Sequence, residues 1–245
     1  DAAQTRVHDV TTAEASLTLR YAPGESFVNS KQRRIPVSLD APIFTLTHAM
    51  GFKGVLGGEY SFNRTEASVW KRFWLPSSWG KIDCSIKAGA EWNTVPFPLL
   101  ILPEANLSYI TQRETFNLIN NMEFLNDRFA SVSLSYDMNG KLFNRIPLIK
   151  NLKWREMFRV RALWGTLTDK NNPFKSSNPD LFRFPMRDGK FTSFVMDPKI
   201  PYVEASVGIY NIFKLLHIEY VHRFTYRDNP GINKNGVRFM VLMAF

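Results

Sequence analysis

The chain has 245 residues, of which 31 are Lys or Arg and 22 are Asp or Glu, so its formal net charge is +9. A hydrophobic share of 44% excludes a disordered chain, and a single cysteine excludes an intrachain disulfide framework or a cysteine-based zinc ribbon. No stretch has the ~18 consecutive apolar residues of a transmembrane helix, so a helical membrane protein is excluded. A membrane β-barrel is not excluded, because barrel strands are apolar only at alternate positions.

Alternation of apolar and polar residues with a period of two is the dominant pattern, and it predicts β-strands. Six segments alternate clearly, and the first three segments along the chain fit less regularly. In chain order, the nine predicted strands are residues 14–22, 41–51, 59–73, 80–93, 128–141, 154–167, 202–211, 214–227 and 236–245. No segment of useful length has the period of an amphipathic helix, and residues 116–126 fit either a short helix or a strand.

The charged residues of the six clear strands lie almost entirely on one face. With the second of these strands counted from Phe129, fourteen Lys, Arg, Asp and Glu residues occupy the polar face, whereas only Glu156 and Lys214 occupy the apolar face. Random placement would divide these charges about evenly between the faces. Each segment is therefore expected to be a strand with one apolar face.

The segments 202–211 and 214–227 predict a hairpin with a tight turn at residues 211–214. This turn would place Ser206 opposite Glu219 on the polar face and Val207 opposite Ile218 on the apolar face. One register then suits both faces, as a hairpin requires.

Three features favour a membrane barrel over a soluble β-sandwich, which also alternates. The predicted strands run for about ten to fourteen residues, longer than the ~5–6 residues usual in soluble sheets. Aromatic residues lie near strand ends on the apolar face, as in the girdles at membrane interfaces; they are Trp92, Trp154, Trp164, Tyr202 and Tyr226. The last strand resembles the C-terminal recognition signal of bacterial outer-membrane barrels through Phe239, Val241, Met243 and Phe245.

The parity of the strands predicts an incomplete barrel. If the last strand runs toward the periplasm, residues 94–127 and 169–200 are outer loops and residues 142–153 form a periplasmic connection. Nine is an odd number, and a barrel with both chain ends in the periplasm needs an even number of strands. We therefore expect residues 1–245 to be the C-terminal barrel segment of a larger barrel.

Several motifs in order resemble one family of Bacteroidota outer-membrane proteins. They are FNLINNMEFLND (116–127), MNGKLFNRIPLIKNLKWRE (138–156), GTLTDKNNP (165–173) and PYVEASVGIYNIF (201–213), with GFKGVLGGEY (51–60) and VPFPLL (95–100) before them. Members of this family join a carboxypeptidase-regulatory-like N-terminal domain, which this sequence does not contain, to a C-terminal β-barrel domain of unknown function. The resemblance implies an outer-membrane location, and it supplies no established catalytic residues.

The polar face of the predicted barrel would line its lumen. The candidate lumen-facing charges are Arg155, Arg159, Arg161, Glu204, Glu219, Arg223 and Arg238. Two alternatives stay open for them: a polar pore that favours anions, or ion-pair networks that fill the barrel. We favour the ion-pair networks.

No catalytic, cofactor-binding or metal-binding residues are predicted. His217 and Glu219 share the polar face of one strand while His222 points the other way, unlike the helical zinc motif. The glycine-rich residues 54–58 lack the Gly-Lys-Ser/Thr of a phosphate loop, and there is no Gly-x-Ser-x-Gly elbow.

We therefore expect an all-β, antiparallel, transmembrane β-barrel in the bacterial cell outer membrane that is not an enzyme and uses no cofactor. The expected role is a structural or scaffold component of an envelope assembly or transport complex, with outer-membrane lipid and other envelope proteins as partners. No nucleic acid is expected, because the cations alternate with apolar residues on strands and form no single run. The alternatives are a passive, anion-leaning pore and a soluble basic β-domain that binds nucleic acid.

Overall fold

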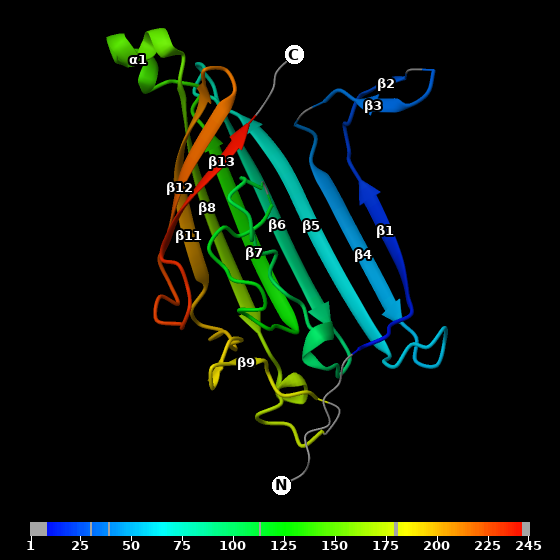
Figure 1. Cartoon of the computed structure of the whole chain (residues 1–245). Helices are drawn as coiled ribbons and strands as arrows, with labels where there is room; N and C mark the ends of the chain where they lie inside the picture. Colours follow the sequence, from blue (N-terminus) through cyan, green and yellow to red (C-terminus); the bar gives the residue numbers. More distant parts are fainter. Residues whose placement is uncertain (1–8, 30, 39, 113, 179–180, 242–245) are drawn as a thin grey trace.

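The computed structural model describes residues 9–29, 31–38, 40–112, 114–178 and 181–241, and most of these residues belong to or pack on one antiparallel sheet. The sheet contains nine strands in the order β1-β4-β5-β6-β7-β8-β11-β12-β13 (Figure 1). Their bounds are β1 Glu14–Tyr21, β4 Ile43–Gly51, β5 Phe62–Trp74, β6 Lys81–Glu91, β7 Arg128–Asp137, β8 Arg155–Thr166, β11 Tyr202–Ile212, β12 Leu216–Arg223 and β13 Asn235–Val241.

The remaining regular elements are short and lie in the connections. Two small hairpins are formed by β2 (Phe27–Asn29) with β3 (Arg34–Pro36) and by β9 (Met186–Arg187) with β10 (Lys190–Phe191). The helical elements are α1 (Pro147–Leu152) and the 3-10 turns η1 (Phe97–Leu99), η2 (Phe143–Arg145) and η3 (Asp169–Asn171). Within the described ranges, no helix has the length and apolar character needed to cross a membrane.

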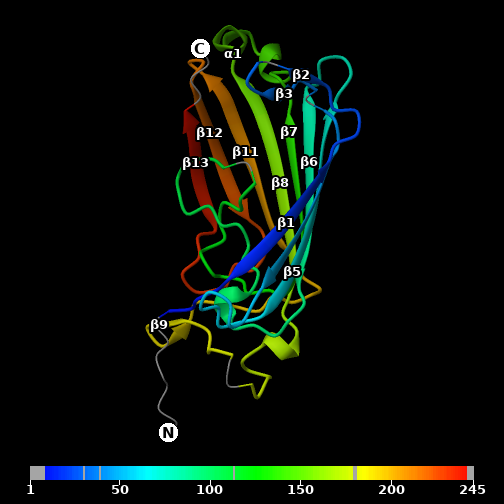
Figure 2. The same ribbon diagram turned by 90° about the vertical axis from the view of Figure 1, so that its right-hand side faces the viewer.

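The prediction of an all-β, antiparallel fold is confirmed, and each of the nine predicted ranges overlaps one strand of the sheet. The order of the strands is a simple meander, so every large connection joins neighbouring strands. In the described part of the chain the sheet is not closed, because β1 and β13 are its two edges. Figures 1 and 2 show that the sheet is curved, and in Figure 1 β1 and β13 lie at its opposite edges.

The predicted register of the β11–β12 hairpin is wrong by two residues. Ser206 pairs with Val221 where Glu219 was expected, and Glu219 pairs with Gly208. Up to Ile209, each paired β11 residue therefore meets a β12 residue two positions further along the chain than a tight turn predicts. The register also shifts between Ile209 and Ile212. Asn211, Phe213 and Lys214 adopt positive φ angles, which widens the turn. Because the error is an even number, the side chains keep the predicted faces.

The two faces of the sheet differ in polarity where β8, β11 and β12 lie side by side. On β12 the buried positions include His217, Glu219 and Arg223, while Ile218 and Tyr220 between them are 40% and 47% exposed. We call the face that carries the buried charges the inner face. The opposite, outer face therefore presents apolar side chains outward.

The segment 92–127, which connects β6 to β7, folds back over the inner face (Figure 1). It contributes Phe116, Ile119 and Phe124 to a core cluster that contains Leu163 of β8 and Tyr202 of β11. The prediction that Tyr202 belongs to an aromatic girdle on the apolar face is therefore wrong. Tyr202 lies two residues before Glu204 on the same strand, so both side chains lie on the inner face, where Tyr202 is fully buried. A second cluster joins residues of the segment to β5 and to the connection after β8; its buried members are Phe62, Val95, Leu100, Leu125, Leu167 and Phe184. The buried core thus lies between the sheet and its own connections.

Residues 116–126, left undecided between helix and strand, form neither: they consist of turns, bends and isolated bridges. Nearby, the segment 92–127 also reaches the free edge of β13. The Phe239 N–H donates to the Tyr109 carbonyl at 2.9 Å, and the Thr111 N–H donates to the Phe239 carbonyl at 2.8 Å. A stretch that the sequence places in an external loop therefore occupies part of a strand edge.

Candidate functional site: an ion-pair network on the inner face

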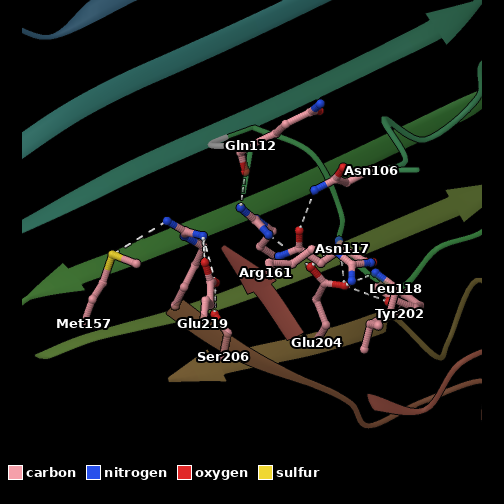
Figure 3. A network of polar contacts seen from close by, with 12 residues as sticks. Asn106, Gln112, Asn117, Leu118, Met157, Arg161, Tyr202, Glu204, Ser206 and Glu219 are labelled. Atoms are coloured by element: carbon pink, nitrogen blue, oxygen red, sulfur yellow. Dashed lines mark hydrogen bonds and ion pairs between the residues drawn. The ribbon is translucent and has the colours of Figure 1, made fainter. Parts of the chain in front are cut away.

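Three buried ion pairs lie on the inner face of β8, β11 and β12. The Arg159 guanidinium donates to both carboxylate oxygens of Glu219 at 2.8 and 2.9 Å. Arg161 Nη1 lies 3.1 Å from Glu204 Oε1, and Arg223 Nη2 lies 2.6 Å from Glu123 Oε1. All six side chains are at most 7% exposed. Figure 3 shows the Arg161–Glu204 pair beside Glu219.

The Glu204 carboxylate is the centre of the network. It accepts the backbone N–H groups of Asn117 at 2.9 Å and Leu118 at 3.0 Å, and the Tyr202 hydroxyl donates to it at 2.9 Å. Together with Arg161, four donors surround one buried carboxylate (Figure 3). Such a carboxylate holds the loop backbone in place, because hydrogen bonds to an ionised acceptor are stronger than those between neutral groups.

The Arg223 guanidinium fixes a second point of the segment 92–127. It donates to both oxygens of Glu123 and to the Leu118 carbonyl at 3.2 Å. Its Cζ atom lies 4.8 Å from the centre of the Tyr202 ring, so the cation also stacks on an aromatic face. Arg223 of β12 therefore contacts the Glu123 carboxylate, the Leu118 carbonyl and the Tyr202 ring.

A further carboxylate, Glu219, links three strands. In addition to Arg159 of β8, it accepts a hydrogen bond from the Ser206 hydroxyl of β11, and His217 Nε2 lies 3.4 Å from its Oε2 atom. Removing one partner from such a buried pair leaves an uncompensated charge, which costs about 3–5 kcal/mol. The network therefore makes the inner face sensitive to single substitutions.

Two of the seven predicted lumen-facing charges lie at the margins of this network. Arg155, at the start of β8, is exposed and lies over the Tyr210 ring at 5.9 Å. Arg238, on the edge strand β13, is half-buried and donates to the Asn117 carbonyl. The other five, Arg159, Arg161, Glu204, Glu219 and Arg223, are buried on the inner face.

The residues of the predicted C-terminal signal divide into two groups. Phe239 and Val241 lie on β13 and are 43% and 56% exposed, whereas Met243 and Phe245 lie outside the described residues.

Sequence reasoning missed the partners that the segment 92–127 supplies. It treated residues 94–127 as an outer loop, so Glu123 and the backbone of Asn117 and Leu118 were not candidates. The apolar content of this segment is the signal that could have found them. External loops are mostly polar, yet Phe116, Ile119 and Phe124 are at most 6% exposed.

A cavity of about 750 Å³ remains on the inner face between the segment 92–127 and strands β4 to β8. Serine side chains form one part of its wall, including Ser85 of β6 and Ser131, Ser133 and Ser135 of β7. Its cations are paired: Arg72 contacts Asp83, Lys81 contacts Asp137, and Lys87 contacts both Glu104 and Glu114. The cavity therefore offers polar groups without an excess of cations.

Among the described residues, no three His, Cys, Asp or Glu side chains gather closely enough to hold a metal ion. In the stretch from His217 to His222, His217 contacts Glu219 on the inner face while His222 contacts Asn235. These two histidines therefore have different hydrogen-bond partners and do not form one site.

An aromatic anchor joins the connections near the end of β12. The Tyr226 hydroxyl donates to the Ile200 carbonyl at 2.7 Å, and the Asp197 N–H donates to it at 3.0 Å. Burial raises the pKa of the Tyr226 phenol, so the hydroxyl stays a donor beyond its usual pH range.

A search of curated proteins finds no match to this chain. A family described as "Family of unknown function (DUF5686) C-terminal domain" matches residues 1–174, which cover β1 to β8 and the segment 92–127. The matched part contains Arg159, Arg161 and Glu123, so one side of the ion-pair network falls within it. This chain belongs to that family of unknown function, through its C-terminal domain.

Proposed function

We propose that this chain is a non-enzymatic β-barrel segment of the bacterial outer membrane that serves as a scaffold within an envelope assembly or transport complex. The observation that carries the proposal is the separation of the two sheet faces. Charged side chains are buried on the inner face, while the outer face presents large apolar side chains, such as Ile86, Val207 and Ile218, that are 40% to 51% exposed. A bilayer is the environment in which such an outer face is stable.

The pairing of the inner-face cations supports a scaffold over a passive pore. Arg159, Arg161 and Arg223 are paired with carboxylates. Arg161 and Arg223 also donate to the segment 92–127, at the Gln112 and Leu118 carbonyls. A pore that favours anions needs cations that face an aqueous path. These three cations are instead bound to carboxylates.

Two measurements on the same preparation test the proposal. A membrane barrel is extracted only by detergent and migrates differently in gels before and after heating, whereas a chain that stays soluble without detergent would contradict it. A nucleic-acid-binding domain would remain soluble and bind nucleic acid in a salt-dependent way.

Conductance in planar bilayers separates a scaffold from a pore. We expect no steady current from the inserted wild-type chain. A steady, anion-selective current would favour the pore. Purification from native membranes under mild detergent then tests the scaffold role directly, since a scaffold retains other envelope proteins and an isolated barrel does not.

A further inference from the structure

The two ends of the sheet differ sharply in charge. Because the sheet is an antiparallel meander, the connections 22–42, 75–80, 138–154 and 213–215 lie at one end, the end that carries α1 (Figure 1). These connections contain eight Lys or Arg residues and two Asp or Glu residues. The connections at the other end, which include the segment 92–127, contain ten of each. We call the first end the basic end.

Four exposed cations of the basic end, from the connections 138–154 and 213–215, lack an acidic residue in their own connection. The connection 138–154 contains four Lys or Arg residues and no Asp or Glu. Arg145, Lys150, Lys153 and Lys214 are exposed, and in the described part of the chain none of them forms an ion pair. The carboxylates that flank this connection in sequence, Asp137 and Glu156, have other partners. Asp137 lies 3.8 Å from Lys81 Nζ and accepts the Tyr210 hydroxyl. Glu156 is buried and accepts the Leu142 N–H at 2.6 Å.

Large apolar side chains are exposed beside these cations. Leu148 of α1 is 81% exposed and Phe213 of the β11–β12 turn is 79% exposed. Both values are high even for this chain, since its exposed large apolar strand residues are 36% to 67% exposed. Leu152 and Leu215, from the same two connections, are 48% and 47% exposed.

Hydrogen bonds hold three connections together at this end. Asn211 Nδ2 donates to the Lys153 carbonyl at 2.7 Å, which joins the β11–β12 turn to the connection after α1. Lys141 Nζ donates to the Ser77 carbonyl at 2.8 Å and lies 5.2 Å from the centre of the Trp79 ring. The cations and the apolar side chains are thus held on linked turns, and an aromatic ring of the interfacial type lies among them.

We propose that the basic end binds the phosphate-bearing headgroups of anionic lipids. Exposed Lys and Arg attract a negative lipid surface. Side chains such as Leu148 and Phe213 gain from contact with the acyl boundary just below it. A nucleic acid or free phosphate would use the cations and leave these apolar groups in water. The assignment rests on the proposed membrane location, since it places the basic end at one membrane surface.

The test compares two triple variants of the full chain. The first, Lys150→Gln with Lys153→Gln and Lys214→Gln, removes three cations from the basic end. The second, Lys190→Gln with Lys199→Gln and Lys234→Gln, removes three exposed cations from the other end and serves as the matched control. Each protein in non-ionic micelles is titrated with phosphatidylglycerol or phosphatidylcholine, and retained lipid is measured by native mass spectrometry.

Wild-type protein and the control variant should retain phosphatidylglycerol more tightly than phosphatidylcholine. The basic-end variant should lose roughly tenfold or more of this preference. Equal retention by both variants would overturn the assignment, as would full competition by inorganic phosphate. Specific binding of an acidic, leucine-rich peptide to the basic end, without any lipid preference, would overturn it in favour of a protein partner.

Gel mobility before and after heating, measured on the same samples, reports separately on the barrel. If wild-type protein folds as a barrel but shows no lipid preference, the headgroup site fails and the proposed function stands. If the chain proves soluble, the proposed function fails. In that case, flotation with phosphatidylglycerol vesicles tests whether the basic end binds anionic lipid. Equal flotation of the two triple variants would refute the headgroup site.

Discussion

The two halves of the sheet are built by different means, although the strands look alike. Strands β8, β11 and β12 bury most of their inner-face residues, and the segment 92–127 packs on this face at Leu163 and Tyr202. Strand β1 is exposed along its whole length, and its ion pair joins Arg20 to Glu25 near the surface. A strand pattern therefore defines two faces, but a face is buried only where another part of the chain reaches it.

The largest expected effect comes from breaking the buried network in the covered half. Arg223→Ala leaves Glu123 buried without its cation and should lower the free energy of unfolding by about 3–5 kcal/mol. Denaturant titration of the detergent-folded chain measures it. The matched variant in the open half, Arg20→Ala, removes a pair whose cation is 46% exposed, so the loss should be much smaller. Similar losses for both variants would show that the two halves do not differ in this way.

A smaller effect is expected from adjacent residues of β6 that lie on opposite faces. Ile86 is 46% exposed on the outer face, whereas Ser85 lines the cavity on the inner face. At mid-membrane depth, Ile86→Arg should cost about 2–4 kcal/mol, because the cation would enter the lipid. Ser85→Arg should cost much less, since the cavity is polar and has room. Equal costs in bilayer-refolding titrations would contradict the assigned faces.

The smallest perturbation is the removal of one packing group at the junction of the segment 92–127 and the sheet. Ile119 is 2% exposed in the core cluster beside Tyr202. Ile119→Val removes one methyl group and should cost about 0.5–1.5 kcal/mol. Leu19→Ala on the exposed β1 removes more atoms, yet in micelles it should cost less, because Leu19 is 57% exposed. Thermal unfolding of both variants under identical conditions compares them.

Hydrogen exchange sharpens the same contrast without any substitution. Amide groups of β11 and β12 should exchange slowly, because opening their backbone hydrogen bonds also requires the contacts of Glu204 and Glu219 to break. Amide groups of β1 should exchange faster, since among the described residues β1 pairs only with β4 and none of its own residues is buried. Mass spectrometry of exchanged peptides measures both, and equal protection would argue that another part of the protein covers β1.

The strands and their faces can be predicted from local sequence. Successive side chains of a strand point to opposite faces, so the alternation of apolar and polar residues within one strand identifies its two faces. The alternation of Ala205, Val207 and Ile209 with Glu204, Ser206 and Gly208 is an example. The hairpin register was not accessible in the same way, since it depends on the positive φ angles of Asn211, Phe213 and Lys214. An error of two residues leaves the face pattern unchanged, so the pattern alone cannot detect it.

The ion-pair network was predicted only in part. Arg161 and Glu204 lie on neighbouring strands, so alternation places them on one face and close together. Glu123 lies 100 residues before Arg223, and no local pattern links the two. The contacts of Asn117 and Leu118 with Glu204 involve backbone N–H groups, which every residue other than proline carries. Long-range packing of an irregular segment therefore had to come from the structure.

Spin-label accessibility along β6 tests whether the outer face meets lipid. Single nitroxide labels at Ser85, Ile86 and Ala88, in a Cys84→Ser background, are compared after reconstitution into bilayers. Labels at Ile86 and Ala88 should be relaxed mainly by oxygen, which concentrates in the hydrocarbon, whereas the label at Ser85 should be relaxed mainly by a water-soluble nickel complex. Aqueous accessibility at all three positions would contradict a membrane-facing outer surface and with it the proposed barrel.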